Sequence, residues 1–310
     1  MSTLDGLGFP EALRWRDGAL WFSDMFRSRV MRWVPGASAE VVLDAAGGGP
    51  IVPGGLGWLP DGSLLVVDCE RRRVLRLPLD SAGRAAGAVA VHADLAREMT
   101  HSANDMHVDV DGTAWVGGYG FDPENDEPAT SPLVRVGPDG DVSTTASLFV
   151  FPNGCQRDAG GALLVAETFA DRVSSFSREN ELTHRGQLPE GSGPDGLSIA
   201  PDGSVYVALA FAGALARLAR FADADPNADP NVNADPDADA NADPNAGPDS
   251  SAEIVYRSEP LTTGPGAGPL GVYDCAVHAD GRRIFVAMAS LDEALAERVD
   301  TGRIVLLDLP

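Results

Sequence analysis

Lysine is absent from this chain of 310 residues, and all 23 of its basic side chains are arginines. That absence excludes two kinds of site. A Schiff base needs a lysine amine, and the P-loop needs a lysine that reaches the phosphates of a nucleotide. Any catalysis must therefore come from other groups, of which the chain has many: 46 Asp and Glu residues.

Cysteine is scarce. The three that occur, Cys69, Cys155 and Cys275, form an odd and widely spaced set. A disulfide framework is therefore not expected, and a reducing cytoplasm is the predicted location. We expect the three thiols to serve as small buried apolar groups.

Long apolar runs are also missing, and none approaches the length needed to span a membrane. The segment from Met1 to Pro10 has neither a basic start nor a long apolar core, so it does not read as a signal peptide. The sequence thus predicts a cytoplasmic protein with no membrane partner. It gives no indication of the oligomeric state.

Positive charge is in deficit, and the net charge is −23. Such a chain is a poor partner for nucleic acid, whose phosphates need a basic face, but it suits cations. Eight of the negative charges lie in a tract rich in Asp, Asn, Ala and Pro at residues 222–250. The tract lacks apolar residues that could offset ordering entropy, so we expect a disordered insertion that catalysis does not need. A calcium-binding repeat is the alternative, although the acidic spacing is irregular.

What the chain does have is a repeat. A turn glycine followed by a strand-like run returns six times, at Gly18, Gly62, Gly112, Gly161, Gly203 and Gly281. The intervals are 44, 50, 49, 42 and 78 residues, and the last contains the acidic tract. A period of 40–50 residues with several short strands per unit is typical of a β-propeller. We predict an all-β, six-bladed propeller that forms a single domain over residues 1–310.

The repeat also places residues in space. Eight positions before the turn glycine, or seven in the first unit, each inner strand begins at one mouth of the central channel. The residues at these ring positions are Glu11, Gly54, Asn104, Asn153, Asp195 and Tyr273. Carboxylate and amide oxygens favour a hard divalent cation, and the lack of His and Cys disfavours zinc. A polar network around ordered water is the alternative.

Four segments carry a family resemblance. They are Glu11-Ala12-Leu13-Arg14-Trp15, Asn104-Asp105-Met106, Phe151-Pro152-Asn153-Gly154 and Pro194-Asp195-Gly196-Leu197. In this order, and each at the same point of its own repeat, they resemble the senescence-marker/gluconolactonase family, the regucalcin-like lactonases. The resemblance runs from about Glu11 to Leu309, interrupted by the acidic tract.

The resemblance implies a metal site and an activity. It implies that Glu11, Asn153 and Asp195 hold one divalent metal ion, with Ca²⁺ as the first choice and Mg²⁺, Mn²⁺ or Zn²⁺ as others. It places Asn104 beside them, in contact with substrate or water. The implied activity is metal-dependent hydrolysis of a lactone or similar small ester. Sugar-lactone members carry an arginine where this chain has Ser102, next to His101.

Roles for the remaining candidates follow from the chemistry. Asp195 is the first candidate to accept a proton from the attacking water, and Asp105 is the second. We expect Ser102 and His101 to contact substrate. No Gly-x-Ser-x-Gly elbow supports a serine mechanism. The aromatic residues expected at the entrance are Phe121, Phe149, Phe151, Phe169 and Tyr273.

Two other functions stay open at this point. One is a non-catalytic calcium-binding or scaffold propeller. The other is an enzyme of the strictosidine-synthase or paraoxonase kind, which shares the six-bladed fold.

The closure of the ring can also be predicted. The last repeat has only three recognisable strands, and an open sheet edge is a liability. Residues near Ser2 to Leu7 should therefore pair against the third strand of blade six.

Overall fold

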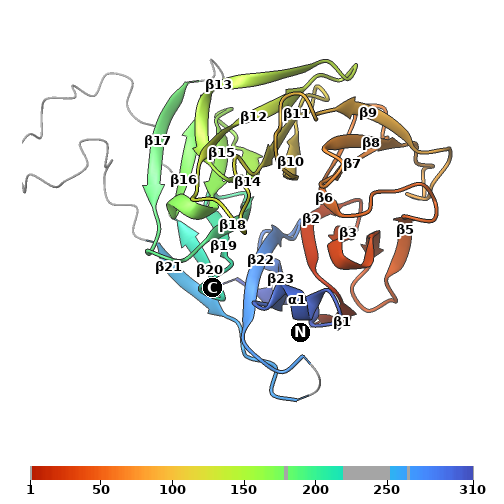
Figure 1. The fold of residues 1–310 in the computed structure, drawn as a ribbon. Helices are drawn as coiled ribbons and strands as arrows, with labels where there is room; N and C mark the ends of the chain where they lie inside the picture. The colour runs from red at the N-terminus through yellow and green to blue at the C-terminus, as the bar shows by residue number, and fades with distance from the viewer. Residues whose placement is uncertain (1, 178–180, 219–251, 264–265, 310) are drawn as a thin grey trace, which may run out of the picture.

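The computed structural model describes residues 2–177, 181–218, 252–263 and 266–309. The acidic tract predicted to be disordered lies outside the described residues. Almost all regular structure is β, and the strands form six four-stranded antiparallel sheets (Figure 1). The predicted six-bladed propeller is confirmed. No helix within the described ranges is long and apolar enough to cross a membrane.

The sheets follow the sequence repeat closely. Blade one consists of β2 (Pro10–Arg16), β3 (Ala19–Asp24), β4 (Arg29–Trp33) and β5 (Glu40–Asp44). Blade two consists of β6 (Pro53–Trp58), β7 (Leu64–Asp68), β8 (Arg73–Leu77) and β9 (Ala90–Asp94). Blade three consists of β10 (Ala103–Val108), β11 (Ala114–Gly118), β12 (Thr130–Val136) and β13 (Val142–Val150). Blade four consists of β14 (Pro152–Arg157), β15 (Leu163–Glu167), β16 (Arg172–Phe176) and β17 (Leu182–Gln187). Blade five consists of β18 (Pro194–Ile199), β19 (Val205–Leu209), β20 (Ala214–Leu218) and β21 (Glu253–Arg257).

Blade six is built from both ends of the chain. It combines β22 (Leu270–Val277), β23 (Arg283–Ser290) and β24 (Gly302–Asp308) with β1 (Ser2–Leu7) as the outermost strand. Strand β1 pairs antiparallel with β24, from Ser2 opposite Leu306 to Leu7 opposite Gly302. The predicted closure by the N-terminal strand is confirmed.

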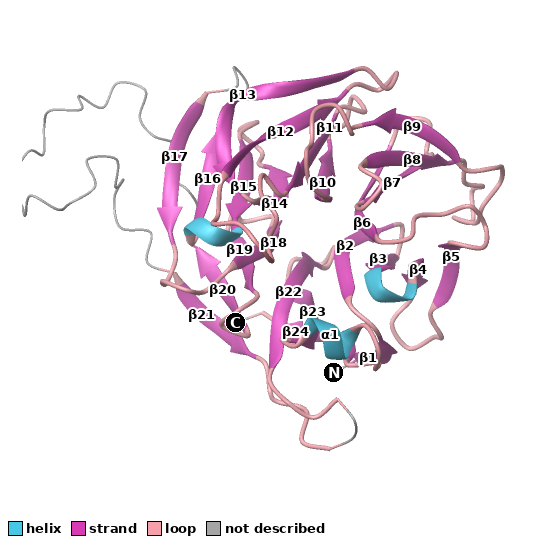
Figure 2. Ribbon diagram, viewed as in Figure 1, coloured by secondary structure: helices cyan, strands magenta, loops and turns pink. Residues whose placement is uncertain are grey.

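The first strand of each blade lies nearest the centre of the ring, and the fourth lies at the rim (Figure 2). Three short helices, η1 (Met25–Arg27), η2 (Thr168–Ala170) and α1 (Glu293–Ala296), follow second strands. They lie on the face where the inner strands begin, which we call the mouth. The turns that contain the repeat glycines lie at the opposite end of the channel.

The core of the protein is divided among the contacts between blades. In the described part of the chain each of the six blade interfaces has its own cluster of buried apolar side chains. At the contact of blades six and one, for example, Phe22 and Leu13 pack with Phe285. A strand such as Leu64–Asp68 is buried on both faces, which explains its continuous apolar run.

A buried acid fixes several of the mouth loops. In blades one, two and four the last residue of the second strand is a buried acid that accepts hydrogen bonds. Its donors are an arginine five residues later and backbone N–H groups of the segment that leads into the same blade. The pairs are Asp24–Arg29, Asp68–Arg73 and Glu167–Arg172. The mouth loops are therefore held by charge-assisted hydrogen bonds.

Candidate active site

Each inner strand changes its register close to its start at the mouth. The irregularities fall at residues 11–14, 53–56, 103–106, 152–155, 194–197 and 272–274. A bulge redirects the side chain that it carries. The predicted ring positions all lie in these six bulges. The same backbone irregularity, repeated in each blade, therefore places four polar residues at the mouth: Glu11, Asn104, Asn153 and Asp195.

The backbone after Glu11 is held in an uncommon conformation. Ala12 has a φ of 53°, in the left-handed region that residues with a side chain rarely adopt. Its side chain is nonetheless buried between blades one and two. A strained residue costs of the order of 1–3 kcal/mol and persists where its surroundings fix it. The blade contact therefore fixes the backbone from which Glu11 projects.

Hydrogen bonds hold the two predicted amide residues. Asn104 donates from Nδ2 to Asn153 Oδ1 at 2.9 Å, and Asn153 Nδ2 donates to Thr168 Oγ1 at 3.2 Å. In this arrangement the nitrogen of the Asn153 amide faces Thr168. Its carbonyl oxygen is therefore turned toward Asn104 and keeps a second lone pair for another partner.

The carboxylate of Asp195 is incompletely satisfied. The residue is only 6% exposed, yet its Oδ1 has no hydrogen-bond partner among the described residues. A buried carboxylate oxygen without a donor is costly, because burial removes the water that would solvate it. The site therefore contains a buried carboxyl oxygen that lacks a hydrogen-bond partner among the described residues.

Negative charge accumulates around this oxygen. Burial raises the pKa of Glu11 well above its ordinary value, and the charges of Asp195, Asp274 and Asp105 raise it further. Burial likewise raises the pKa of Asp195, again with Asp274 and Asp105 contributing, while a hydrogen bond with Asn153 opposes the shift. A bound cation would stabilise both ionised carboxylates and reverse these shifts.

The predicted donor set fits a hard divalent cation. It offers two carboxylates and one amide carbonyl, all oxygen, with an unpartnered oxygen on Asp195. In the described residues no group of three His, Cys, Asp and Glu side chains is arranged to hold a metal ion. The predicted set contains only two such residues, because its third member is Asn153.

Below the mouth, an arginine joins three blades across the channel. Arg14 Nη2 lies 2.7 Å and 3.0 Å from the two carboxylate oxygens of Asp105 and donates to the Met106 carbonyl at 2.9 Å. Its Nη1 lies 3.6 Å from Asp274 Oδ2. Asp105, the second candidate base, is therefore held in an ion pair with the Arg14 guanidinium below the mouth.

The other two predicted substrate contacts lie farther out. His101 and Ser102 line a rim pocket of about 360 Å³ between blades two and three, together with Arg72 and Tyr119. The Ser102 carbonyl accepts a hydrogen bond from the Tyr119 backbone N–H at 3.0 Å. Neither residue is among the groups that hold Asn153 or Asp195.

Four of the five aromatic residues expected at the entrance lie on or beside the mouth loops, and Phe149 does not. Phe149 is 1% exposed and packs with Phe176 in the core between blades three and four. The expectation for Phe149 is wrong because strand β13 extends to Val150, and its alternation turns Phe149 inward. Tyr119, which was not expected there, stacks on Phe151 with ring centroids 3.8 Å apart.

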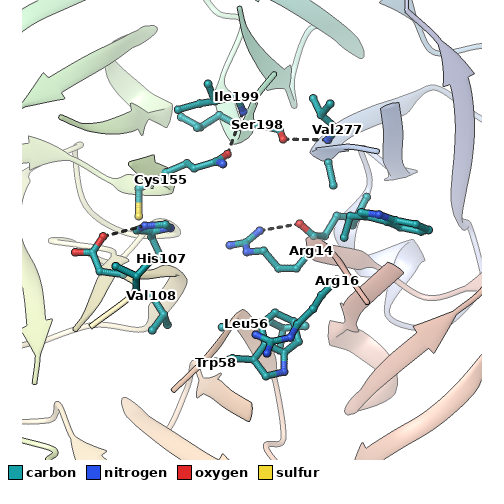
Figure 3. Close-up of a pocket in the computed structure, with 18 of the residues that line it drawn as sticks. Arg14, Arg16, Leu56, Trp58, His107, Val108, Cys155, Ser198, Ile199 and Val277 are labelled. Atoms are coloured by element: carbon teal, nitrogen blue, oxygen red, sulfur yellow. Dashed lines mark hydrogen bonds and ion pairs between the residues drawn. The ribbon is translucent and has the colours of Figure 1, made fainter. Parts of the chain in front are cut away.

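The opposite end of the channel forms a separate cavity of about 530 Å³. Figure 3 shows its lining, with Arg14, Arg16, His107 and Ser198 directed toward the space between the inner strands. None of the predicted metal ligands lines this cavity. Arg14 lines this cavity and also forms the ion pairs below the mouth.

A comparison with protein families agrees with these observations. Residues 9–226 match the model described as the SMP-30/gluconolactonase/LRE-like region. The chain belongs to this family. No curated protein matches the chain by sequence.

Solved structures show the same fold at low identity. A gluconolactonase from Xanthomonas campestris is 20% identical, with a TM-score of 0.63 over 99% of this chain and 88% of that one. A luciferin-regenerating enzyme is 15% identical, with a TM-score of 0.69 over 99% and 93%. A calcium-binding regucalcin from Agrobacterium tumefaciens is 15% identical, with a TM-score of 0.64 over 98% and 93%.

The network around Arg14 and Asp274 was not predicted from the sequence. The signal was available in the repeat, one position after the ring, where most blades have Gly or Ala but blades three and six have Asp105 and Asp274. Both of these acids face Arg14. Reading two adjacent positions of the repeat would have found the pair.

Proposed function

We propose that this member of the SMP-30/gluconolactonase family is a divalent-metal-dependent hydrolase of a lactone or similar small cyclic ester. Glu11, Asn153 and Asp195 would hold the ion. The observation that carries the proposal is the buried, unpartnered Oδ1 of Asp195 beside a second carboxylate. A cation at that point would satisfy the oxygen and neutralise the local charge. Ca²⁺ is the first candidate, because the donors are all oxygen.

The residues of the site have distinct roles in this proposal. When bound, the ion would act as a Lewis acid that polarises the ester carbonyl. Asp195 accepts a proton as the water oxygen attacks the carbonyl carbon. It returns that proton to the ring oxygen as the ester C–O bond breaks, and the product is a hydroxy acid. One carboxylate oxygen of Asp195 would bind the ion, which leaves the other to accept the proton.

Asn104 orients the Asn153 amide through the 2.9 Å hydrogen bond and stands at the mouth beside it. In this proposal the partner is a small neutral molecule and not a nucleic acid, in keeping with the net charge of −23.

A second candidate function is calcium binding without catalysis. The similarity in fold to a calcium-binding regucalcin favours it. The same three ligands would serve, and no lactone would be hydrolysed. The two proposals therefore agree on the ion and differ on turnover.

The test combines metal titration with a lactone panel. Asp195→Asn and Glu11→Gln should weaken the binding of Ca²⁺ or Mn²⁺ by more than about 100-fold, because they alter ligands directly. Turnover by Asp195→Asn should fall by about 10²–10⁴-fold. Asp17→Asn, an exposed acid at the far end, is the matched control and should change neither quantity.

Isothermal titration calorimetry and hydrolysis rates with and without EDTA separate the outcomes. Unchanged metal affinity in both ligand variants would contradict the site. Metal binding without turnover of any lactone would favour the non-catalytic alternative.

A further inference from the structure

The loops of blades three, four and five bring aromatic side chains together at the mouth. The set, here called the aromatic arc, consists of Tyr119, Phe121, Phe151, Phe169 and Phe211. Ring centroids are 3.8 Å apart for Tyr119 and Phe151, and 5.4 Å for Phe121 and Phe169. Phe169 continues the contact to Phe211 at 6.0 Å. The arc is thus continuous across three blades.

The end of the arc is open to solvent. Phe169 is 37% exposed and Phe211 is 48% exposed, although both are large apolar groups. Leu291 of blade six, 36% exposed, lines a small pocket together with Phe211. Single exposed apolar residues are ordinary, but several that lie together beside a polar centre indicate a contact surface.

The arc adjoins the candidate metal ligands. Phe151 lies two residues before Asn153, and a Cβ placed on Gly193 would lie 2.4 Å from the Phe211 ring. That ring therefore covers the backbone two residues before Asp195. Burial raises the pKa of the Tyr119 hydroxyl, and the charges of Glu293, Asp195 and Glu11 add to the shift, so the ring lies near the candidate ligands. A molecule whose carbonyl reaches Asp195 would lie against these rings.

Two polar side chains near the arc are directed to the protein itself. Arg72, which shares the rim pocket with Tyr119, donates to the Met99 and Thr100 carbonyls at 3.1 Å. The hydroxyl of Thr168, next to Phe169, accepts from Asn153. A site that selects a polyhydroxylated molecule needs free donors and acceptors that converge on its hydroxyls. Here the nearest surface offers aromatic faces instead.

We propose that the aromatic arc binds an apolar substituent of the substrate, so that the preferred lactone carries an alkyl or aryl group and not a set of hydroxyls. This inference rests on the proposed lactonase function. It assigns substrate selection to Phe169 and Phe211, which touch the substituent, whereas Glu11, Asn153 and Asp195 act at the ester. Apolar contact with an aromatic face is favourable in water.

Steady-state kinetics of the full chain with saturating metal test the inference. The substrates are an alkyl-substituted δ-lactone, a phenyl-substituted γ-lactone and the polyhydroxylated δ-gluconolactone. We expect the two apolar lactones to have KM values at least about tenfold lower, since a few buried methylenes suffice for that difference. Phe169→Ala and Phe211→Ala should raise these KM values about 3- to 10-fold and leave kcat nearly unchanged.

Two controls accompany these variants. Val91→Ala removes an exposed apolar group on blade two and should change no KM. Phe169→Leu keeps an apolar side chain and should restore part of the lost affinity. A preference for δ-gluconolactone, or equal effects of the arc variants on all three substrates, would overturn the inference and leave the lactonase proposal intact.

A complete lack of turnover would count against the proposed function, and a binding measurement would then decide on the arc. The probe is an alkyl-substituted cyclic ketone, which has a similar shape and cannot be hydrolysed. Weaker binding by Phe169→Ala and Phe211→Ala supports the arc as an apolar site, whereas equal binding by variants and parent protein overturns it.

Discussion

At the scale of single residues, the most consequential contact lies below the mouth. Arg14 faces two buried acids, Asp105 and Asp274, so one positive charge is shared by two carboxylates. Asp274 also accepts hydrogen bonds from the backbone N–H groups of Leu13 and Cys275. Burial raises the pKa of Asp274 from 3.8 to about 7, with Arg14 opposing the shift and Asp105 adding to it.

This shift predicts an unusual pH dependence for the metal-free protein. Between pH 4 and 7 the folded state holds a proton on Asp274 that the unfolded chain has released. The free energy of unfolding should therefore fall as pH rises through this range and level off above about 7. Glu11 and Asp195, whose pKa values are also raised, act in the same direction. Carboxylates with lowered pKa values act only below pH 4.

Thermal melting in EDTA from pH 4.5 to 7.5 measures this slope. Asp274→Asn should make it shallower, and saturating Ca²⁺ should reduce or reverse it, because the ion binds the deprotonated carboxylates. A melting temperature that rises with pH in EDTA would show that Asp274 stays ionised in the folded protein.

At the scale of elements, the inner strand explains why a glycine follows each of two candidate ligands. A Cβ on Gly154 would lie 2.6 Å from the Asp195 carbonyl oxygen and from Gly196 Cα. A Cβ on Gly196 would lie 1.8 Å from the Asp274 carboxylate. The strand of the next blade approaches so closely that only glycine fits. The Pro-Asn-Gly and Pro-Asp-Gly segments thus each contain the start of a strand, a candidate ligand and a glycine at a point of close contact between blades.

Gly154→Ala should consequently destabilise the protein by about 1–3 kcal/mol, as expected for overpacking against backbone that cannot move aside. Urea denaturation measures the change in the free energy of unfolding. Gly137→Ala is the matched control, because a Cβ there meets Asp141 at an ordinary 3.6 Å. If both variants unfold at the same urea concentration, the blades are less closely packed at the mouth than this structure indicates.

At the scale of the whole molecule, the ring is closed by β1. Its residues pair along β24, Leu7 is buried in the cluster between blades six and one, and Asp5 forms an exposed ion pair with Arg303 at 2.8 Å. The chain then runs directly into Glu11. Closure of the ring and placement of a candidate ligand therefore depend on the same segment.

Removing residues 2–7 should lower the melting temperature by at least about 5 °C, because the blade loses a strand and a buried leucine. It should also weaken metal binding, since the segment that leads into Glu11 would no longer be held by pairing with β24. Arg303→Ala, which removes only the exposed ion pair, should shift the melting temperature by less than about 2 °C. A truncated protein that melts like the full chain would mean that β1 contributes little to closure.

The strands on either side of the acidic tract show at which end of blade five the tract is inserted. The strands that flank it end at Leu218 and begin at Glu253, and Leu218 pairs with Val205 at the end of blade five away from the mouth. The described strands on either side of the tract therefore end and begin on the face opposite the candidate metal ligands.

The period of the repeat can be read from the sequence alone, and the number of blades and the residues at the mouth follow from it. Turn glycines at regular intervals predicted six blades, the ring positions of Glu11, Asn104, Asn153 and Asp195, and the need for a strand from the N-terminus. These follow from sequence because each depends on local turn chemistry and on counting along a strand. Only the tertiary structure decided which side chains meet across blades. The ion pairs of Arg14, the burial of Phe149 and the continuity of the aromatic arc each join residues from different blades, and a repeat that describes one blade at a time contains no information about such contacts.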